Sequence, residues 1–246
     1  MDLSFDTTLP PGSNSSLPRV LGITGGIGAG KSYIAGALAP FMPVFDCDRS
    51  AKTIYSSPNK AYTDALKALL GPDIYQDGAP QFKLIAQRLF SQPELLRRAE
   101  ALIHPYVREE FARWRSQFAT TPQPAPAPAE GNSSSAPEDA LRVLGHQSAV
   151  MPPGWVGLES AILIEKGFDA LCHAVLYIDA PRDLRLQRVE ARDGAPRRAI
   201  LRRMNAQHSL VTTYSARPLL VFSNDKPGLS PSFFPLLRSF LESVPL

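Results

Sequence analysis

VLGITGGIGAGKS, residues 20–32, is the stretch that decides the fold. Its second half, from Gly25 to Ser32, is a full match to the phosphate-binding pattern G-x-x-x-x-G-K-[ST]. Glycines let the backbone adopt positive φ and wrap a phosphate closely, and the following helix presents its N-terminal amides to the anion. In this pattern Lys31 contacts the β- and γ-phosphates and the Ser32 hydroxyl ligates Mg²⁺. The stretch therefore predicts a nucleotide-binding loop.

The residues on either side of the loop fit this interpretation. Residues 19–24 predict a short buried strand, and the apolar residues 34, 35, 38 and 39 lie at helical spacing before Pro40 and Pro43. The motif requires strand, loop and helix in that order. A glycine-rich turn that matched by chance would not have this context.

Composition sets the broad class of the protein. The chain has 246 residues, 44% of them hydrophobic, which allows one large domain or a core with inserted subdomains. Its net charge of +3 is too small to indicate a nucleic-acid partner by itself. Two cysteines without metal-ligand spacing favour a reduced, cytoplasmic location. No apolar run is as long as a membrane span, and no membrane partner is expected; the sequence does not define the oligomeric state.

Two aspartates follow the next apolar segment. Residues 43–48, PVFDCD, predict a short strand whose alternation puts Asp46 and Asp48 on the same side, at the carboxyl end beside the loop. A carboxylate there accepts a proton from an attacking hydroxyl or holds Mg²⁺ through water. The alternative is a helix N-cap, since Asp-x-Asp often precedes helices. The neighbouring phosphate loop favours the functional interpretation.

The middle of the chain divides into two parts. Residues 51–118 show helical spacing of apolar residues and predict a helical subdomain, interrupted at Gly71-Pro72 and at His104-Pro105. Considered alone, His104 is more often a capping or core histidine than a catalyst. Residues 119–154 contain a Pro/Ala/Ser tract and predict a flexible surface insertion, as residues 1–18 predict a flexible tail.

The second half of the chain alternates strands and helices. Extended runs are predicted at residues 155–164, with Glu159 inside and Glu165 just past it, and at 174–179 and 219–223, and an apolar helical stripe runs from Phe233 to Val244. This alternation predicts a parallel sheet covered by helices on both faces.

Arginines are concentrated between the second and third of these strands. Eight arginines stand against three acids between Arg182 and Arg203, and the first four share one helix face. Arginine grips phosphates bidentately, so the cluster predicts a lid over a transferring phosphoryl group. A solvated basic face or an RNA-binding patch is the alternative.

These blocks together resemble the dephospho-coenzyme A kinases, a family of P-loop kinases. The resemblance covers residues 19–224 apart from the insertion, and its most specific part is the order of the blocks. The matching blocks are Gly22–Ser32, Val44–Asp48, Ala99–Pro105 and Ile162–Glu165, followed by Arg188, Arg192, Arg203, Gln207 and Asn224.

The resemblance implies a three-layer α/β/α P-loop NTPase fold with a parallel sheet. Its core would comprise residues 19–50 and 155–246, with a lid at about 182–207 and a helical substrate-binding domain at 51–118. It further implies ATP as donor, Mg²⁺ as metal, and dephospho-CoA as the small-molecule acceptor, phosphorylated on its ribose 3′-hydroxyl. No nucleic-acid partner is implied.

The resemblance also assigns residues. Asp48 would be the base, with Asp46 as second candidate, and Lys31 and Arg188 would also be catalytic. Asp46, His104 and Arg188 would contact the acceptor, and Ser32 the metal. The nucleotide-binding residues would be Gly25, Gly26, Ile27, Gly28, Ala29, Gly30, Lys31, Ser32, Tyr33, Arg192 and Asn224.

Departures from the family pattern leave two other functions open. Tyr33 replaces a usual threonine, Ala161 a proline, Arg185 a glutamine and Phe82 an arginine, which bears on acceptor identity more than on phosphoryl transfer. A nucleoside or nucleoside-monophosphate kinase is one alternative, and a diverged nucleotide-binding module is the other. A GTPase is disfavoured, because residues 224–227 do not spell the guanine-reading N-K-x-D.

Overall fold

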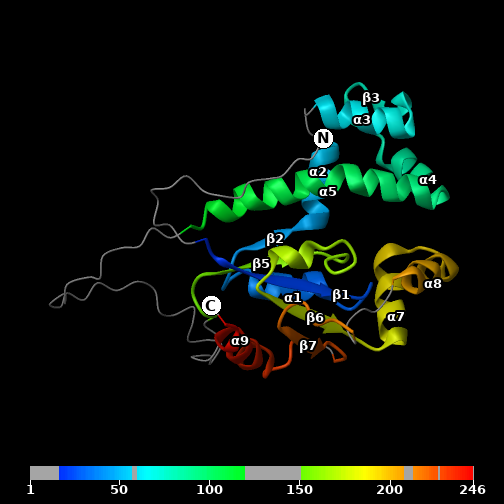
Figure 1. Ribbon diagram of the computed structural model, residues 1–246. Coiled ribbons are helices and arrows are strands. Elements are labelled where there is room, and N and C mark those ends of the chain that lie inside the picture. The colour runs from blue at the N-terminus through cyan, green and yellow to red at the C-terminus, as the bar shows by residue number, and fades with distance from the viewer. Residues whose placement is uncertain (1–16, 57–59, 120–150, 208–212, 227, 246) are drawn as a thin grey trace, which may run out of the picture.

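A five-stranded, wholly parallel sheet forms the centre of the protein (Figure 1). The computed structural model describes residues 17–56, 60–119, 151–207, 213–226 and 228–245. The strand order is β2-β5-β1-β6-β7, so the strand that carries the glycine-rich loop is central. The strands are β1 (Arg19–Gly25), β2 (Val44–Asp46), β5 (Trp155–Glu159), β6 (Ala174–Asp179) and β7 (Leu219–Ser223).

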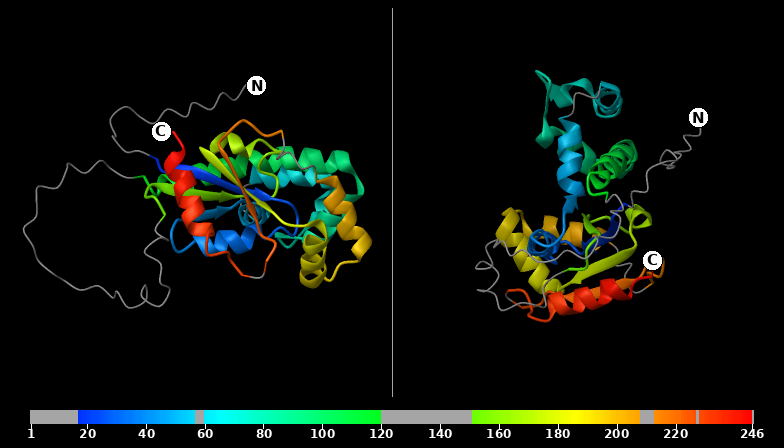
Figure 2. Two further views of the ribbon diagram at one scale, coloured as in Figure 1. Left: turned by 90° about the horizontal axis from the view of Figure 1, so that it is seen from below. Right: turned by 90° about the vertical axis from the view of Figure 1, so that its left-hand side faces the viewer.

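Helices cover both faces of the sheet, as the alternation of elements predicts (Figures 1 and 2). Side chains of β1 alternate between two cores. Leu21 and Ile23 pack with α1 (Lys31–Leu38) and α9 (Phe233–Ser243), whereas Val20 packs with α5 (Pro93–Ser116) on the opposite face. The predicted three-layer α/β/α fold is thus confirmed.

A group of helices stands above the sheet, on the side of α5 (Figure 2, right). Helix α2 (Cys47–Tyr55) leads from β2 to α3 (Lys60–Leu70) and α4 (Phe82–Ser91). The helical pattern is broken by a hairpin of β3 (Tyr75–Gln76) and β4 (Ala79–Pro80), which the helical prediction for this region missed. The sequence signal for this hairpin is the pair Asp77-Gly78. Both residues adopt positive φ, as a tight hairpin turn requires.

Helix α5 runs without interruption through Pro105, so the predicted break at His104-Pro105 is wrong. A proline inside a helix removes one backbone hydrogen bond and disfavours the helical conformation before it. Here Ala99, Ile103, Val107 and Phe111 form one buried stripe on both sides of the proline. This continuous packing against the core outweighs the local preference.

Two predicted strands end earlier than expected. Strand β2 stops at Asp46, whose carboxylate accepts the backbone N–H of Arg49 at 2.9 Å and caps α2. Strand β5 stops at Glu159, and the predicted extension to residue 164 is a turn, in which Lys166 N–H bonds Ile162 C=O at 3.0 Å. At the end of each strand the next hydrogen bonds are made outside the sheet: by the Asp46 carboxylate after β2, and by the turn from Ile162 to Lys166 after β5.

The arginine-rich segment forms two helices beside the carboxyl end of the sheet, at the right of Figure 1. They are α7 (Arg182–Asp193) and α8 (Arg197–Ala206), and they bury a small cluster of their own from Leu186, Val189, Ile200 and Met204. Most of the predicted tail (1–18) and insertion (119–154) lies outside the described residues, at 1–16 and 120–150. The insertion was predicted too long at its end, because Met151 is buried in the core with Trp155. No helix in the described part of the chain is long and apolar enough to cross a bilayer.

Candidate active site

The glycine-rich loop joins β1 to α1 in the predicted order of strand, loop and helix. Gly25, Gly28 and Gly30 adopt positive φ of 149°, 80° and 98°. A Cβ at Gly25 would lie 2.1 Å from the carbonyl oxygen of Ile178, so glycine is required there for the close approach of β6 as well as for the conformation. The loop therefore ends at the N-terminus of α1, where a helix attracts anions.

Lys31, the first residue of α1, folds its side chain back over the loop. Its Nζ donates to the carbonyl oxygens of Gly25 and Gly26 at 3.0 and 3.2 Å. Burial lowers the pKa of Lys31, while the carboxylates of Glu159 and Asp48 act in the opposite direction. The ammonium group is thus part of one electrostatic cluster with two acids.

Glu159 is a site residue to which the sequence reasoning gave no role. It ends β5, it is 8% exposed, and its Oε1 accepts the Ser32 hydroxyl at 2.8 Å. Burial raises its pKa, against the effect of the Ser32 hydrogen bond. A signal existed, because open α/β sheets bind ligands at the carboxyl ends of their strands. The overlong strand prediction hid Glu159 inside the run.

The two aspartates have different surroundings. Asp46 uses its carboxylate to cap α2, as the structural alternative proposed. Asp48 lies in the first turn of α2, and its pKa is raised first by desolvation and then by Asp46, while Lys31 lowers it. Asp48 remains solvent-accessible although protein surrounds it on several sides. It lies close enough to Lys31 for the two charges to interact, and within the described part of the chain its carboxylate accepts no hydrogen bond.

Two further candidate residues meet the loop from other elements. Arg188 of α7 directs Nη1 to the carbonyl oxygen of Ala29 at 3.4 Å, and buried Asn224, just after β7, donates Nδ2 to the same oxygen at 2.8 Å. Tyr33 lies on the first turn of α1 and is 52% exposed. The structure thus brings Arg188 and Asn224 against the glycine-rich loop.

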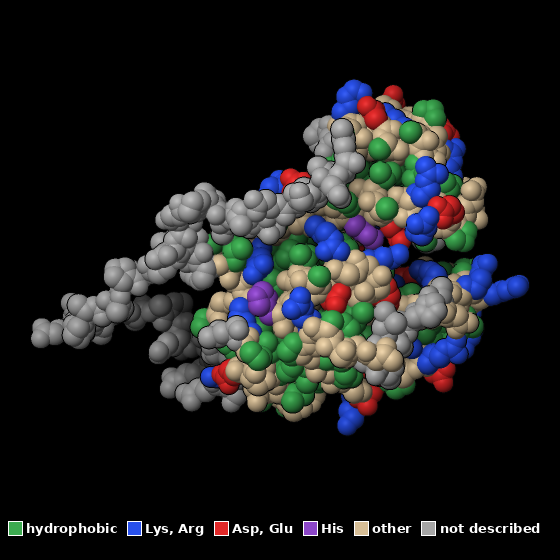
Figure 3. Space-filling view, viewed as in Figure 1, with side chains coloured by type: hydrophobic (Ala, Val, Ile, Leu, Met, Phe, Trp, Pro, Cys, Tyr) green, Lys and Arg blue, Asp and Glu red, His purple; other side chains and the backbone are tan. Residues whose placement is uncertain are grey.

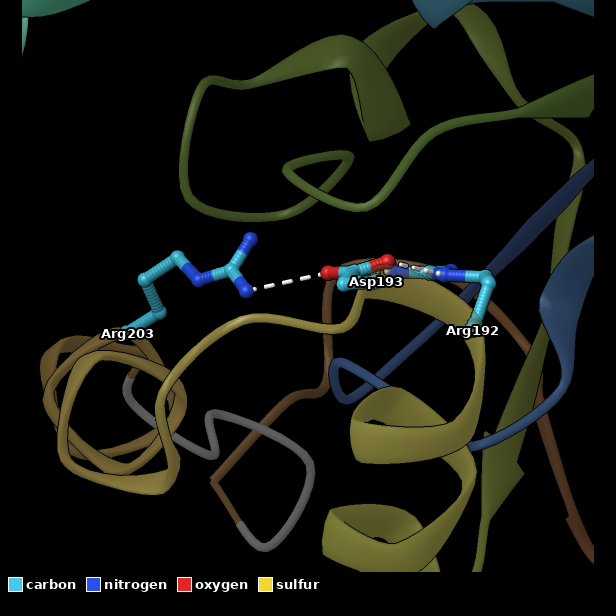
Figure 4. Close-up of polar contacts among 3 residues, drawn as sticks. All are labelled: Arg192, Asp193 and Arg203. Atoms are coloured by element: carbon cyan, nitrogen blue, oxygen red, sulfur yellow. Dashed lines mark hydrogen bonds and ion pairs between the residues drawn. The ribbon is translucent and has the colours of Figure 1, made fainter.

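Arg192 is held in an ion-pair network that joins α7 to α8 (Figure 4). Its Nε contacts Asp193 Oδ1 at 2.6 Å, and Arg203 of α8 contacts Asp193 Oδ2 at 3.0 Å. Hydrogen bonds from both arginines lower the pKa of Asp193 to about 2. Asp193 therefore ties the end of α7 to α8, and Arg192 is still close enough to Lys31 to lower its pKa.

His104 lies away from this cluster, at the junction between α5 and the segment that follows β5. Its ring packs edge-on against Phe168 with centroids 5.3 Å apart, and burial lowers its pKa. The nearby Glu100–Lys166 ion pair, 2.6 Å long, and Arg108 supply its charged surroundings. The structure does not bring His104 together with Lys31 and Asp48.

A cleft of about 1070 Å³ opens between α8 and α5. Figure 3 shows the molecule indented on this side, with basic side chains over α7 and α8. The cleft has apolar walls and charged groups, contributed by Ile27, Leu96, Ala161, Ile162, Glu165, Lys166, Asp193, Ala195, Ala199, Arg202, Arg203 and Gln207. Such a mixed lining suits a ligand with both anionic and apolar parts.

Comparison with known proteins decides the family. A family model described as Dephospho-CoA kinase matches residues 19–124 and 146–226, which is most of the chain. The chain belongs to the dephospho-CoA kinase family. Membership makes it a transferase that uses ATP and acts on a small molecule.

Individual dephospho-CoA kinases are similar along most of their length. The Porphyromonas gingivalis enzyme is 32% identical over 188 residues, covering 76% of each chain. The Thermus thermophilus enzyme is 31% identical over 197 residues, covering 80% of this chain and 78% of that one.

Solved structures agree on the fold. A Thermus thermophilus crystal structure matches with a TM-score of 0.62 at 27% identity, over 92% of this chain and 96% of that one. A dephospho-CoA kinase from Campylobacter jejuni matches with a TM-score of 0.50 at 16% identity, which bears on the fold alone.

Proposed function

We propose that this protein transfers the γ-phosphoryl group of ATP to the ribose 3′-hydroxyl of dephospho-CoA, the last step of coenzyme A synthesis. One observation carries the assignment of residues. The ammonium of Lys31, at the start of α1, shares an electrostatic cluster with Asp48 of α2 and Glu159 of β5. A phosphoryl donor site and an acid able to orient an alcohol are thus close together.

The phosphoryl group is held by the loop and the lid in this proposal. The loop amides and Lys31 bind the β- and γ-phosphates, for which the ammonium exchanges its contacts with the carbonyl oxygens of Gly25 and Gly26. Arg188 approaches the loop from α7 and neutralises charge on the transferring group. Arg192 and Asn224 lie at the same end of the sheet and complete the nucleotide site.

Asp48 is the base in this proposal and Asp46 is not. The carboxylate of Asp46 already accepts the Arg49 N–H in the first turn of α2, whereas the carboxylate of Asp48 accepts no hydrogen bond from any described residue and lies near Lys31. Its raised pKa brings a carboxylate closer to the range in which it accepts protons efficiently. Phosphoryl transfer has a loose transition state, so orientation of the hydroxyl matters more than proton removal.

Ser32 and Glu159 fit a magnesium ion. Both offer the oxygen ligands that Mg²⁺ prefers, and the ion usually takes only one or two protein ligands beside water and substrate phosphates. When bound, the ion supplies positive charge that stabilises the charge on the phosphates. Beside the ion, Glu159 would orient the Ser32 hydroxyl through the hydrogen bond that it accepts from it.

The acceptor would enter the cleft between the lid and α5. At about 1070 Å³ the cleft is at the upper end of ligand pockets. Lys166, Arg202 and Arg203 offer positive charge for a diphosphate, and Leu96 and Ile162 offer an apolar wall for an aliphatic arm. His104, on α5, would act indirectly by supporting the Lys166 side of this cleft.

An ADP-release assay tests the proposal. The purified chain is given ATP and Mg²⁺ with dephospho-CoA, AMP, adenosine or pantetheine as acceptor. We expect ADP release with dephospho-CoA, and a product with the mass of coenzyme A. Faster release with AMP or adenosine would identify a nucleotide or nucleoside kinase, and no release with any acceptor would leave a nucleotide-binding module.

We further propose a cytoplasmic location, consistent with two buried free thiols.

A further inference from the structure

The side chain of Gln207 joins three segments that are far apart in the sequence. The backbone N–H of Ile27 donates to Gln207 Oε1 at 2.8 Å, and Gln207 Nε2 donates to the carbonyl oxygen of Ala161 at 3.1 Å. The Gln207 backbone N–H bonds Arg203 C=O at 3.3 Å and ends α8. The glycine-rich loop, the turn after β5 and the end of the lid therefore meet at one amide group.

Only an amide of this length meets both requirements. Ile27 needs an acceptor and Ala161 needs a donor, and the glutamine side chain provides one of each. A glutamate would keep the acceptor but lose the donor, and would set a negative charge against a carbonyl oxygen. A methionine has similar length and would leave both backbone groups without this partner.

The position of these bonds bears on nucleotide binding. The Ile27 N–H is occupied by Gln207, and the Ala29 N–H bonds Gly26 C=O at 3.0 Å, so both ends of this turn of the loop are held in place. The turn pinned through Ala161 follows Glu159, the partner of Ser32. Gln207 also lines the large cleft, and it lines a smaller cavity together with Thr24 and Tyr177.

We propose that Gln207 is a positioning residue for ATP, which holds the first half of the phosphate loop in place and anchors the end of the lid. The inference rests on the proposed function only in taking ATP as the ligand of the loop. It assigns no contact between Gln207 and substrate. Without the bridge, the loop must be ordered by the nucleotide itself, and affinity for ATP falls.

The test uses the full chain with three substitutions. Gln207→Met removes both hydrogen bonds, and Gln207→Glu keeps the acceptor for Ile27 but removes the donor to Ala161. Asn205→Ala is the matched control, because Asn205 is exposed on α8, two residues before Gln207, accepts a hydrogen bond from Arg182, and is not among the described residues that line either cavity. Amide exchange at Ile27 and the Kd for ATP are measured without any acceptor.

We expect Gln207→Met to speed amide exchange at Ile27 and to raise the Kd for ATP by about fivefold to tenfold, which is the effect of one to two net hydrogen bonds. Gln207→Glu should leave the Ile27 amide protected from exchange. It should weaken ATP binding at least as much as Gln207→Met does, because its negative charge lies beside the phosphate site. In turnover assays the loss should appear in the KM for ATP rather than in kcat. Asn205→Ala should match the wild type.

Unchanged exchange at Ile27 in Gln207→Met, or unchanged ATP affinity in both Gln207 variants, would overturn the inference. A lower Tm with unchanged ATP affinity would show that Gln207 only packs the end of α8, and would also overturn it. If Gln207→Met does not fold, the nearly isosteric Gln207→Glu carries the test through ATP affinity. Failure of dephospho-CoA as acceptor would refute the proposed function and leave these acceptor-free measurements valid.

Discussion

The hydroxyl of Ser32 donates to the carboxylate of Glu159 over 2.8 Å, which joins the first turn of α1 to the end of β5. The serine comes from the nucleotide loop, and the acid from the strand that pairs with β1 in parallel. Because Glu159 is buried, its orientation is fixed by the sheet and not by solvent. The pair therefore presents two oxygen atoms at a defined place beside the phosphate loop.

Substitution of Glu159 should act through the metal. In Glu159→Gln the Ser32 hydroxyl keeps a neutral acceptor, but the site loses the charge that attracts and orients a cation. We expect the Mg²⁺ concentration needed for half-maximal activity to rise about 10- to 100-fold, as for other residues that orient metal ligands. A Mg²⁺ titration of activity measures this. Glu109→Gln, on the exposed side of α5, is the control, and an equal Mg²⁺ requirement in both variants would exclude this role.

Loss of the loop lysine should cost more than loss of the base. Lys31→Ala removes an ammonium that stabilises charge on the transferring group, and we expect kcat to fall about 10³-fold. Asp48→Asn keeps a hydrogen-bonding side chain that orients the hydroxyl, and a loose transition state needs little proton removal. We therefore expect kcat of this variant to fall only about 10²-fold. Steady-state kinetics of both variants would contradict this account if the order were reversed.

The fold was predictable from the sequence where local and global signals agree. The central strand, the glycine loop and the strands at 174–179 and 219–223 all lie where hydrophobic pattern predicts them. The β3–β4 hairpin was missed although Asp77-Gly78 is a local signal for it, whereas the break predicted at Pro105 was wrong because long-range packing decides there. Pro105 is accommodated because residues on both sides of it share one buried stripe, which the sequence order alone does not reveal.

The site was predictable only in part, for the same reason. Lys31, Ser32 and Asp48 are in motifs with known spacing, so they could be named in advance. Glu159 becomes a candidate only when β5 is known to pair with β1 and to end there. Gln207 matches the family pattern, but its hydrogen bond to Ile27 spans 180 residues, which no local pattern encodes.

Alanine substitution at two glycines should change the free energy of unfolding in opposite directions. In Gly22→Ala the new Cβ would lie 2.8 Å from Cys172 Sγ and Leu163 Cδ2 in the core, so we expect a loss of about 1–3 kcal/mol in the free energy of unfolding. Gly36, inside α1, has nothing within 4 Å of that position, and alanine should add about 0.5–1 kcal/mol. Chemical denaturation of both variants checks the sign, and equal destabilisation would contradict the packing described here.

Asp48 should limit stability at neutral pH. Its pKa in the folded protein is raised above 3.8, mainly by desolvation and then by Asp46, so the ionised carboxylate is less favourable in the folded state than in the unfolded chain. This cost is present above the raised pKa and disappears as the pH falls through it, because the folded carboxyl then takes up a proton. Asp48→Asn should therefore have a higher Tm than the wild type at pH 7.

The difference in Tm should narrow as the pH is lowered toward 4, since the wild-type carboxyl becomes neutral like the amide. Thermal unfolding followed by circular dichroism at both pH values measures it. Asp64 is the control, because a hydrogen bond from Lys60 lowers its pKa, so Asp64→Asn should give no gain at pH 7. A gain for Asp48→Asn that is equal at both pH values would mean that charge at position 48 is not its cause. A gain confined to neutral pH would show that stability is given up there to keep a carboxylate beside Lys31.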